Sequence, residues 1–246
     1  MSSPDLLPVA ILAGGLATRL HPITQTIPKA LVPVAGEPFL FHQLRYLRAQ
    51  GVRRVVICTG YLGEMIEEAV GSGGAFGLHV EVARDGDKLL GTGGALKAAL
   101  PRLGASFFVL YGDSFLPCDF GAAQNAFFAS GKPALMTIID NHNRWDRSNI
   151  DYRDGRLVKY DKLNPSADMH HIDYGLGVLA ASVFDSYPSG QAFDLASVYT
   201  GLSESGSLAA LEVFERFYEI GSHRGLKETQ EYFAAHLQTE QSGDSR

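Results

Sequence analysis

Residues Val9–Leu20 read VAILAGGLATRL, an apolar tetrapeptide followed at once by a glycine-rich loop that carries a threonine and an arginine. The tetrapeptide Val9–Leu12 has the length and apolar content of a buried strand. The adjacent Gly14 and Gly15 let the backbone approach a ligand closely and point several N–H groups into one concavity, which suits a phosphate. This stretch therefore predicts a strand with an anion-binding loop at its carboxyl end.

Polar side chains around this loop strengthen the prediction. Thr18 adds a hydroxyl donor, and the planar guanidinium of Arg19 can hold phosphate oxygens in bidentate fashion. Lys29, which follows Pro28, supplies a second cation. A bare Gly-Gly pair with nearby surface charges is more typical of a plain strand-to-helix turn, so the prediction of a phosphate site depends on the whole run.

Outward from the loop, short apolar runs alternate with amphipathic segments. Strands separated by helices favour right-handed βαβ crossovers and a mainly parallel sheet. We therefore expect an α/β, Rossmann-like sheet flanked by helices. The predicted strands are Val9–Leu12, Arg54–Thr59, residues 78–82 and Phe107–Tyr111, and the predicted helices are Phe39–Gln50, Leu62–Val70 and Ala95–Leu100, the last ended by Pro101.

After about residue 140 the pattern becomes mixed. Asn149–Tyr152 and Arg156–Tyr160 flank Asp154-Gly155, which predicts a hairpin. Ile172–Leu179 and Arg216–Ile220 are further strand candidates, and a last helix is expected from His223. No repeat and no Pro-, Gly- or Ser-rich linker divides the chain. We expect one domain over residues 1–237 and a polar, disordered tail over 238–246.

Composition narrows the class of partner. The 246 residues are 46% hydrophobic, enough for the core of one α/β domain. The 27 acidic residues against 21 Lys and Arg give a net charge of −6, which argues against nucleic acid or an anionic membrane as partner. Cys58 and Cys118 form no CxxC pair, so neither zinc nor a disulfide is predicted. Without a signal peptide or a membrane-spanning run, a cytoplasmic protein is expected.

The run from Leu12 to Pro38, LAGGLATRLHPITQTIPKALVPVAGEP, resembles the signature of the sugar-nucleotide pyrophosphorylases, a nucleotidyltransferase family with a GT-A-like fold. Ala17 stands where that family usually has glycine. The resemblance implies that Arg19 and Lys29 act in catalysis. It also implies a set of nucleotide-binding residues in this run, Leu12, Ala13, Gly14, Gly15 and Thr18.

A second loop, Leu90–Ala95 (LGTGGA), resembles the family segment whose main chain hydrogen-bonds the nucleobase. The resemblance implies base binding by Gly91, Thr92, Gly93 and Gly94. The preceding Lys88-Leu89 differs from the Glu-Pro common in relatives, so the choice of base stays open. Asp85-Gly86-Asp87, a D-x-D triplet of the kind used by glycosyltransferases, is interpreted as a turn before this loop.

Two acids match the metal ligands of the family. Asp113 follows the apolar run Phe107–Tyr111, and carboxylates at the carboxyl ends of strands in open α/β sheets face the ligand. Glu219, in FYEIGS, stands where the family usually has Asp and is one methylene longer. Oxygen ligands suit a hard cation that bridges phosphates. The resemblance thus implies Mg²⁺ on Asp113 and Glu219.

The sugar site is implied by two further segments. Tyr160-Asp161-Lys162 resembles the family's F-x-E-K, in which the acid touches sugar hydroxyls and the lysine binds the sugar phosphate. The resemblance thus implies that Asp161 binds the sugar and that Lys162 acts in catalysis by orienting the attacking phosphate. Asp173, Tyr174 and Gly175 match a strand that lines the sugar site. The adjacent His170 and His171 point to opposite faces of a strand, so metal chelation by this pair is not expected.

The resemblance implies attack of a sugar 1-phosphate on the α-phosphorus of a nucleoside triphosphate, with release of pyrophosphate and catalysis by positioning and charge neutralisation. GTP with a heptose or mannose-type 1-phosphate is the favoured pair, by similarity to heptose 1-phosphate guanylyltransferases. Alternatives are a UTP-dependent N-acetylmuramate or hexose 1-phosphate uridylyltransferase, a glycosyltransferase, and a non-catalytic sugar-nucleotide sensor. A monomer or a small homo-oligomer is expected.

Overall fold

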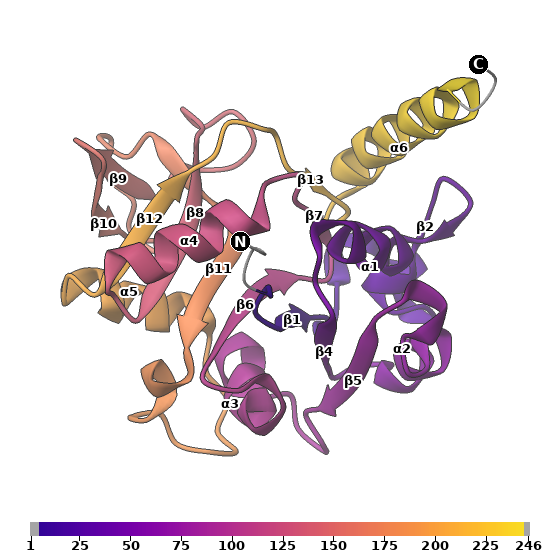
Figure 1. Cartoon of the computed structure of the whole chain (residues 1–246), viewed down its shortest axis with the longest axis horizontal. Coiled ribbons are helices and arrows are strands. Elements are labelled where there is room, and N and C mark those ends of the chain that lie inside the picture. Colours follow the sequence, from indigo (N-terminus) through magenta and orange to yellow (C-terminus); the bar gives the residue numbers. More distant parts are fainter. Residues whose placement is uncertain (1–4, 244–246) are drawn as a thin grey trace.

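The computed structural model describes residues 5–243, with side chains up to residue 236. Within these residues the chain forms a nine-stranded sheet with helices on both faces (Figure 1). The strands of the sheet are β1 (Val9–Leu12), β4 (Arg54–Thr59), β5 (His79–Arg84), β6 (Ser106–Tyr111), β8 (Ala134–Asp140), β9 (Ile150–Arg153), β10 (Arg156–Tyr160), β11 (His171–Ala180) and β12 (Leu208–Glu212).

The sheet is parallel in its first half and mixed in its second. Strands β6, β1, β4 and β5 lie side by side and parallel, whereas β11 pairs antiparallel with both β6 and β8. Strand β12 returns parallel to β8, and β9 and β10 form the predicted hairpin. The predicted mixed, mainly parallel α/β fold in one domain is therefore confirmed.

Helices and two small ribbons complete the fold. The ribbons are β2 (Pro33–Val34) with β3 (Glu37–Pro38), and β7 (Ser114–Phe115) with β13 (Tyr218–Glu219). The α-helices are α1 (Phe39–Gln50), α2 (Gly63–Val70), α3 (Gly91–Leu103), α4 (Phe120–Ser130), α5 (Leu195–Glu204) and α6 (His223–Gly243). Short 3-10 turns cover Thr18–Leu20, Ile23–Gln25, Lys29–Leu31, Gly74–Phe76 and Ala181–Phe184.

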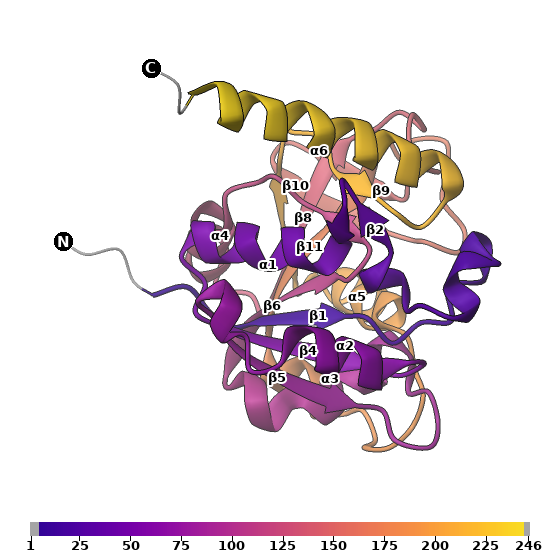
Figure 2. The same ribbon diagram turned by 90° about the vertical axis from the view of Figure 1, so that its right-hand side faces the viewer.

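The core has two layers because successive side chains of a strand point to opposite faces of the sheet. In β1, Val9 and Ile11 pack in the cluster that includes α1 and α4, and Ala10 and Leu12 pack in the cluster with α3 and α5. Figure 2 shows α1 and α4 on one side of β1 and α3 on the other. All four β1 side chains are buried, so the strand that carries the glycine loop is held rigidly.

Most predicted elements, such as β5 and β9, are displaced by no more than one or two residues, but three differ more clearly from the structure. Helix α3 begins at Gly91 and continues past Pro101 to Leu103, where the sequence predicted residues 95–100. Proline removes only one hydrogen bond near the end of the helix, and burial of Leu103 holds the last turn in place. The strand predicted over 216–220 is reduced to β13. Helix α6 extends to Gly243, into the segment predicted as a tail, whose disorder stays a prediction.

The predicted ligand edge of the sheet lies at the carboxyl ends of β1, β4, β5 and β6. Strand β1 ends at Leu12, before the glycine loop, and β6 ends at Tyr111, before Gly112-Asp113. Register pairing sets Leu12 beside Tyr111, so the two segments leave the sheet together. In the described part of the chain, no helix is both long and apolar enough to cross a membrane.

Candidate active site

The glycine loop wraps closely over the end of β4. Ala13 N–H donates to the carbonyl of Cys58 (2.8 Å), and a Cβ on Gly14 would lie only 3.0 Å from the backbone nitrogen of Gly60. Glycine at position 14 is therefore required by packing of backbone on backbone. Ala17 has φ 52°, a left-handed conformation that glycine adopts without strain. The family's glycine at this position thus has a conformational reason.

A cavity of about 310 Å³ opens beside this loop. Its wall contains most of the residues predicted to bind the nucleotide, together with the predicted catalytic lysine and one predicted metal ligand. These residues are Leu12, Ala13, Gly14, Gly15, Gly91, Thr92, Lys29 and Asp113. Thr18 does not line it. We call this space the nucleotide cavity.

A second cavity, of about 430 Å³, adjoins the first. It contains the predicted catalytic residue Lys162 and the predicted sugar-binding residues Asp173, Tyr174 and Gly175. Arg19 and Glu219 also line it. The two cavities share Tyr111 and Asp113, so Asp113 lies at their junction. We call this second space the sugar-side cavity.

Lys29 and Asp113 meet directly at this junction. The Lys29 Nζ donates to Asp113 Oδ2 at 2.7 Å, and both side chains are about one-fifth to one-quarter exposed. Ser114 Oγ donates to the other carboxylate oxygen at 3.2 Å. One predicted cation and one predicted metal ligand are therefore in contact, although 84 residues separate them in the chain.

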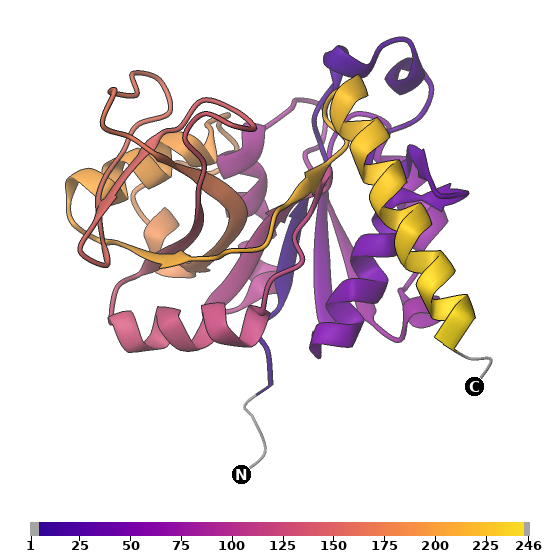
Figure 3. The ribbon, with the colours of Figure 1, turned by 90° about the horizontal axis from the view of Figure 1, so that it is seen from above.

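Arg19, Asp113 and Glu219 converge on the backbone of Gly221. A Cβ on Gly221 would lie 3.5 Å from Arg19 Nη2, 3.3 Å from Asp113 Oδ2 and 2.6 Å from Glu219 Oε2. Figure 3 shows how the fold achieves this, because the segment after β1 lies next to the start of α6. Two cations and two carboxylates thus surround the point where the two cavities meet.

The Glu219 carboxylate is fixed by the turn that follows β13. Gly221 N–H donates to Oε2, and Ser222 Oγ donates to Oε1 at 2.7 Å. A Cβ on Gly225 would overlap Oε1 and would lie 2.7 Å from the Glu219 carbonyl oxygen. Gly225 therefore provides the space that the longer side chain of glutamate needs.

These carboxylates fit a hard divalent cation. Asp113 and Glu219 offer oxygen atoms that face one point, and Mg²⁺ is commonly held by one or two carboxylates together with substrate phosphates. No cluster of three or more His, Cys, Asp or Glu suited to a metal ion occurs among the described residues, so an all-protein metal cage is not formed there. The donor set thus matches a cation shared with a phosphate ligand.

Asp173 is the acid of the sugar-side cavity. Its Oδ1 accepts from Gly175 N–H at 2.9 Å, and Asn149 Oδ1 accepts from its N–H at 3.3 Å. Burial raises the pKa of Asp173 to about 6, while the Gly175 hydrogen bond and the charge of Lys162 act in the opposite direction. Within the described residues this carboxylate has no ion-pair partner, so it presents an acceptor to a ligand.

Asp161, also predicted to bind the sugar, lies outside both cavities. Its carboxylate pairs with Lys159 at 3.0 Å and accepts from the N–H groups of Leu163 and Asn164. These hydrogen bonds, that of Asn164 first, lower the pKa of Asp161. The structure therefore gives this acid a turn-forming role next to Lys162.

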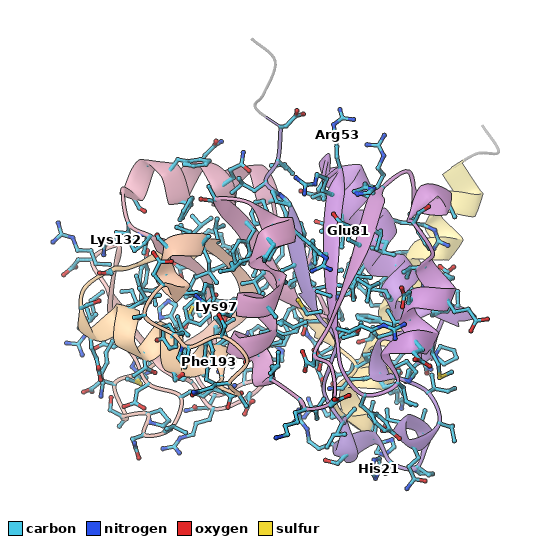
Figure 4. All side chains as sticks on the ribbon, turned by 90° about the horizontal axis from the view of Figure 1, so that it is seen from below. His21, Arg53, Glu81, Lys97, Lys132 and Phe193 are labelled. Atoms are coloured by element: carbon cyan, nitrogen blue, oxygen red, sulfur yellow. The ribbon has the colours of Figure 1, made fainter. Side chains whose placement is uncertain are left out.

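The residues of the second glycine loop, 91–94, make two different kinds of contact. Gly91 and Thr92 line the nucleotide cavity. The N–H groups of Gly93 and Gly94 instead donate to the carbonyl of Phe193, which is labelled in Figure 4. A Cβ on either glycine would collide with residues 191–194. The second pair of glycines thus allows α3 to pack closely on the segment before α5.

Asp85, interpreted from the sequence as part of a turn, lines the nucleotide cavity. Its Oδ2 accepts from Leu90 N–H at 3.0 Å, and burial raises the pKa of its carboxyl group. Asp85 follows β5 directly, at the carboxyl end of a parallel strand, and this position in the sequence indicates a residue that faces the ligand. Asp194 reaches the same cavity from a segment about a hundred residues away.

The segment between β8 and β9 adds residues that sequence reasoning missed. Trp145, Asp146 and Asn149 line the sugar-side cavity, as do Arg216 and Phe217 from the segment before β13. His170 and His171 lie away from it; His171 pairs with Glu212 and His170 stacks on His142. These contacts give the two histidines a structural role.

A glycine loop after the first strand, cations and paired carboxylates at the junction of two cavities, and an open α/β sheet define a class of enzyme that transfers part of a nucleotide. The chain belongs to the Nucleotidyl transferase family, whose model matches residues 9–147. Members of this family generally use a divalent metal ion and bind a nucleoside triphosphate and a sugar 1-phosphate.

Relatives and solved structures agree with this assignment. The chain is 30% identical over 229 residues to the N-acetylmuramate α-1-phosphate uridylyltransferase of Neisseria meningitidis, covering 89% of this chain and 95% of that protein. It is 29% identical over 178 residues to the D-glycero-α-D-manno-heptose 1-phosphate guanylyltransferase of Campylobacter jejuni, covering 72% and 77%. HddC from Yersinia pseudotuberculosis, solved with GMP-PN, superimposes with a TM-score of 0.73 at 26% identity, covering 93% of this chain and all of that one.

The protein is thus an enzyme of sugar-nucleotide biosynthesis, a sugar 1-phosphate nucleotidyltransferase. The D-x-D triplet at Asp85-Gly86-Asp87 is the feature of this sequence that favours a glycosyltransferase. In the structure Asp85 lies in the cavity that carries the family's own glycine loop, and Asp87 is exposed. The family match therefore accounts for the site without a glycosyltransferase.

Proposed function

We propose that this enzyme transfers GMP from GTP to a heptose or mannose-type sugar 1-phosphate in the cytoplasm, releasing pyrophosphate with the help of Mg²⁺. The observation that carries the proposal is the meeting of Arg19, Lys29, Asp113 and Glu219 where the two cavities join. Two polyanions that react with each other need this arrangement of fixed positive charge at the point of contact.

The roles of the residues follow from their positions. Lys29, in the wall of the nucleotide cavity, neutralises the α-phosphate, and Arg19 stabilises the charge that develops on pyrophosphate. Lys162, in the sugar-side cavity, orients the attacking phosphate. The attacking oxygen is already anionic, so no general base is needed. Asp113 and Glu219 would hold Mg²⁺, which when bound neutralises phosphate charge.

Asp85 supports guanine as the base. Guanine presents adjacent N1–H and N2–H₂ donors, which a carboxylate can accept together, whereas uracil presents one N–H between two carbonyl groups. Asp85 Oδ2 already accepts from Leu90 N–H, and a carboxylate oxygen has capacity for a further hydrogen bond. The HddC structure was solved with GMP-PN, which carries the same base.

A second candidate is a UTP-dependent N-acetylmuramate 1-phosphate uridylyltransferase. It is supported by the Neisseria relative, which matches this chain over most of both lengths. The two candidates differ in the base and in the charge of the sugar, because N-acetylmuramate carries a carboxylate and a heptose or mannose does not. The acidic side chains Asp85 and Asp173 in the two cavities favour the first candidate.

A pyrophosphate-release screen tests the proposal. The purified protein is incubated with Mg²⁺ and each combination of ATP, GTP, CTP, UTP and dTTP with mannose, glucose, heptose and N-acetylmuramate 1-phosphates. We expect the highest kcat/KM for GTP with the heptose or mannose compound. Release only with UTP and N-acetylmuramate 1-phosphate selects the second candidate, and no release with any pair contradicts the function.

A further inference from the structure

Helix α1 carries a row of polar side chains, each of which bonds to the main chain of the segment that follows β6. Gln43, Tyr46 and Gln50 recur at the spacing of one helical face. Tyr46 Oη donates to the carbonyl of Cys118 at 3.1 Å, and Gln50 Oε1 accepts from Phe120 N–H at 3.2 Å. These two bonds attach the far end of that segment to the helix.

Gln43 bonds to the near end of the segment, around Asp113. Its Nε2 donates to the carbonyl of Tyr111 at 2.9 Å and to the carbonyl of Ser114 at 2.7 Å. One amide group therefore holds both carbonyls that flank Gly112-Asp113, and we call residues 111–114 the Asp113 turn. An amide NH₂ has two donors, so it can hold together two carbonyl oxygens that would otherwise repel each other.

The amide of Gln43 is directed wholly at this turn. Gln43 is only 3% exposed, and its Oε1 atom has no protein partner among the described residues. The neighbouring Leu44 and Leu47 show that apolar side chains fill the space between α1 and the sheet. Packing alone thus does not require an amide at position 43, whereas the two carbonyls of the turn do.

The Asp113 turn positions both carboxylates that meet at the junction of the cavities. Asp113 lies within the turn, and its carbonyl accepts from Ile220 N–H at 2.9 Å. Ser114 pairs with Glu219 across the ribbon of β7 and β13. A shift of the turn therefore moves the main chain of both acids.

The hold on the main chain complements the ion pair at the Asp113 side chain. The carboxylate of Asp113 is in contact with Lys29 Nζ at 2.7 Å. A divalent cation that binds Asp113 competes with Lys29, so this ion pair cannot fix the carboxylate in the metal-bound state. The hydrogen bonds of Gln43 go to the main chain alone and do not depend on this exchange.

We propose that Gln43 is a positioning residue of the metal site, which fixes the main chain of Asp113 and, through Ser114, that of Glu219, so that the two carboxylates meet one divalent cation. This inference rests on the proposed function, in which these two acids hold Mg²⁺. Gln43 lines neither cavity and acts on the ligands through the backbone. Loss of a group that orients metal ligands typically costs on the order of 10–100-fold in metal affinity or activity.

Binding of Mn²⁺ alone tests the inference without turnover, because Mn²⁺ takes the same oxygen ligands as Mg²⁺. Free Mn²⁺ is measured by electron paramagnetic resonance. Gln43→Met, which keeps the length of the side chain and removes the N–H donors, should bind Mn²⁺ at least about tenfold more weakly than the wild type. An unchanged affinity overturns the inference, even if the melting temperature falls.

Gln50→Met is the matched control, because it removes a hydrogen bond between the same helix and the same segment at a point beyond the Asp113 turn. It should lower the melting temperature by a few degrees and leave the affinity for Mn²⁺ within about twofold. An equal loss of Mn²⁺ affinity in Gln50→Met would show a general loosening of the fold and would also overturn the inference.

Gln43→Glu carries the test if the methionine variant does not fold. Burial beside two carbonyl oxygens keeps the introduced carboxyl group neutral, so one O–H donor remains and the affinity for Mn²⁺ should be intermediate. In the pyrophosphate assay, Gln43→Met should need at least about tenfold more Mg²⁺ for its half-maximal rate. A wild-type Mg²⁺ requirement in both variants overturns the inference and leaves the transferase reaction intact. A wild-type protein that neither binds Mn²⁺ nor releases pyrophosphate would instead remove the proposed function, and the inference with it.

Discussion

The ammonium group of Lys29 lies 2.7 Å from Asp113 Oδ2, so this lysine already forms an ion pair with one of the two carboxylates that face the phosphate site. A divalent cation that binds Asp113 must compete with this lysine, and a phosphate ligand can draw the lysine away. Charge at the reaction centre is therefore balanced before substrate arrives.

Replacement of Lys29 should affect Mg²⁺ binding and turnover in opposite directions. Lys29→Gln should bind Mg²⁺ several-fold more tightly in the absence of nucleotide, because the competing charge is gone. The same variant should turn over at least about a hundredfold more slowly. Calorimetric titration with Mg²⁺ and the pyrophosphate assay measure the two effects. Lys132→Gln is the control, because Lys132 is a half-buried lysine that bonds to the carbonyl of Leu208 and lines neither cavity (Figure 4). Weaker Mg²⁺ binding in Lys29→Gln would contradict the competition.

Gly225 should be essential to the position of the Glu219 carboxylate. Gly225→Ala introduces a Cβ that overlaps Oε1, so the carboxylate must rotate away from the junction of the cavities. We expect turnover to fall more than about tenfold, with a raised requirement for Mg²⁺. Gly201→Ala is the matched control: that glycine lies in α5 with nothing near its Cβ position, so alanine should be neutral or stabilising by about 1 kcal/mol. Equal rates in both variants would show that Gly225 does not act on Glu219.

Asp173 makes stability depend on pH in an unusual direction. Its folded pKa of about 6 is raised from 3.8 by burial, so between these values the folded state binds more protons than the unfolded state. Stability from this group therefore falls as pH rises from 4 to 6, and the cost is fully present at pH 7. Asp173→Asn should raise the melting temperature by a few degrees at pH 7, with a smaller difference near pH 4.

Thermal unfolding at several pH values measures this effect. Asp185→Asn, which removes an exposed aspartate, is the control and should leave the melting temperature unchanged across the range. A gain in Asp173→Asn that is equal at pH 4 and pH 7 would contradict the assignment of the shift to Asp173.

Base choice should depend on Asp85. In Asp85→Asn one acceptor oxygen becomes an NH₂ donor, which opposes the guanine donors. The kcat/KM for GTP should fall at least about tenfold, and that for UTP should change less, because a bidentate contact discriminates by about 1–3 kcal/mol. Asp87→Asn, two residues on and exposed, provides the comparison. An equal loss for both nucleotides would remove Asp85 from base selection.

Local sequence patterns predicted the parts of the molecule that depend on neighbouring residues. The strand at Val9–Leu12, the helix at Phe39–Gln50 and the hairpin around Asp154-Gly155 occur where the pattern indicates. The family motifs also indicated Arg19 and Asp113, which the fold brings to one junction. These features are encoded by periodicity, turn residues and strand ends, which are local properties.

Other features depend on contacts that are distant in sequence. Gly93 and Gly94 bond to Phe193, about a hundred residues away, and no pattern in the loop reveals that partner. Trp145 reaches the sugar-side cavity because buried Asn141 shapes its loop, although the segment has the composition of an ordinary surface turn. Contacts of this kind are decided by tertiary packing, and a single sequence does not display them.

Arg19 and Asp113 are expected to act together on the phosphates at the junction of the two cavities. Arg53→Ala is the matched control, because Arg53 is exposed and lies at the end of the molecule opposite His21, which follows the phosphate loop (Figure 4). The most direct measurement is pyrophosphate release by the wild type, Arg19→Ala, Asp113→Asn and Arg53→Ala with the best nucleotide and sugar 1-phosphate. Both site variants should lose at least about a hundredfold in turnover while Arg53→Ala retains the wild-type rate. A near-normal rate in Arg19→Ala or Asp113→Asn would contradict the account.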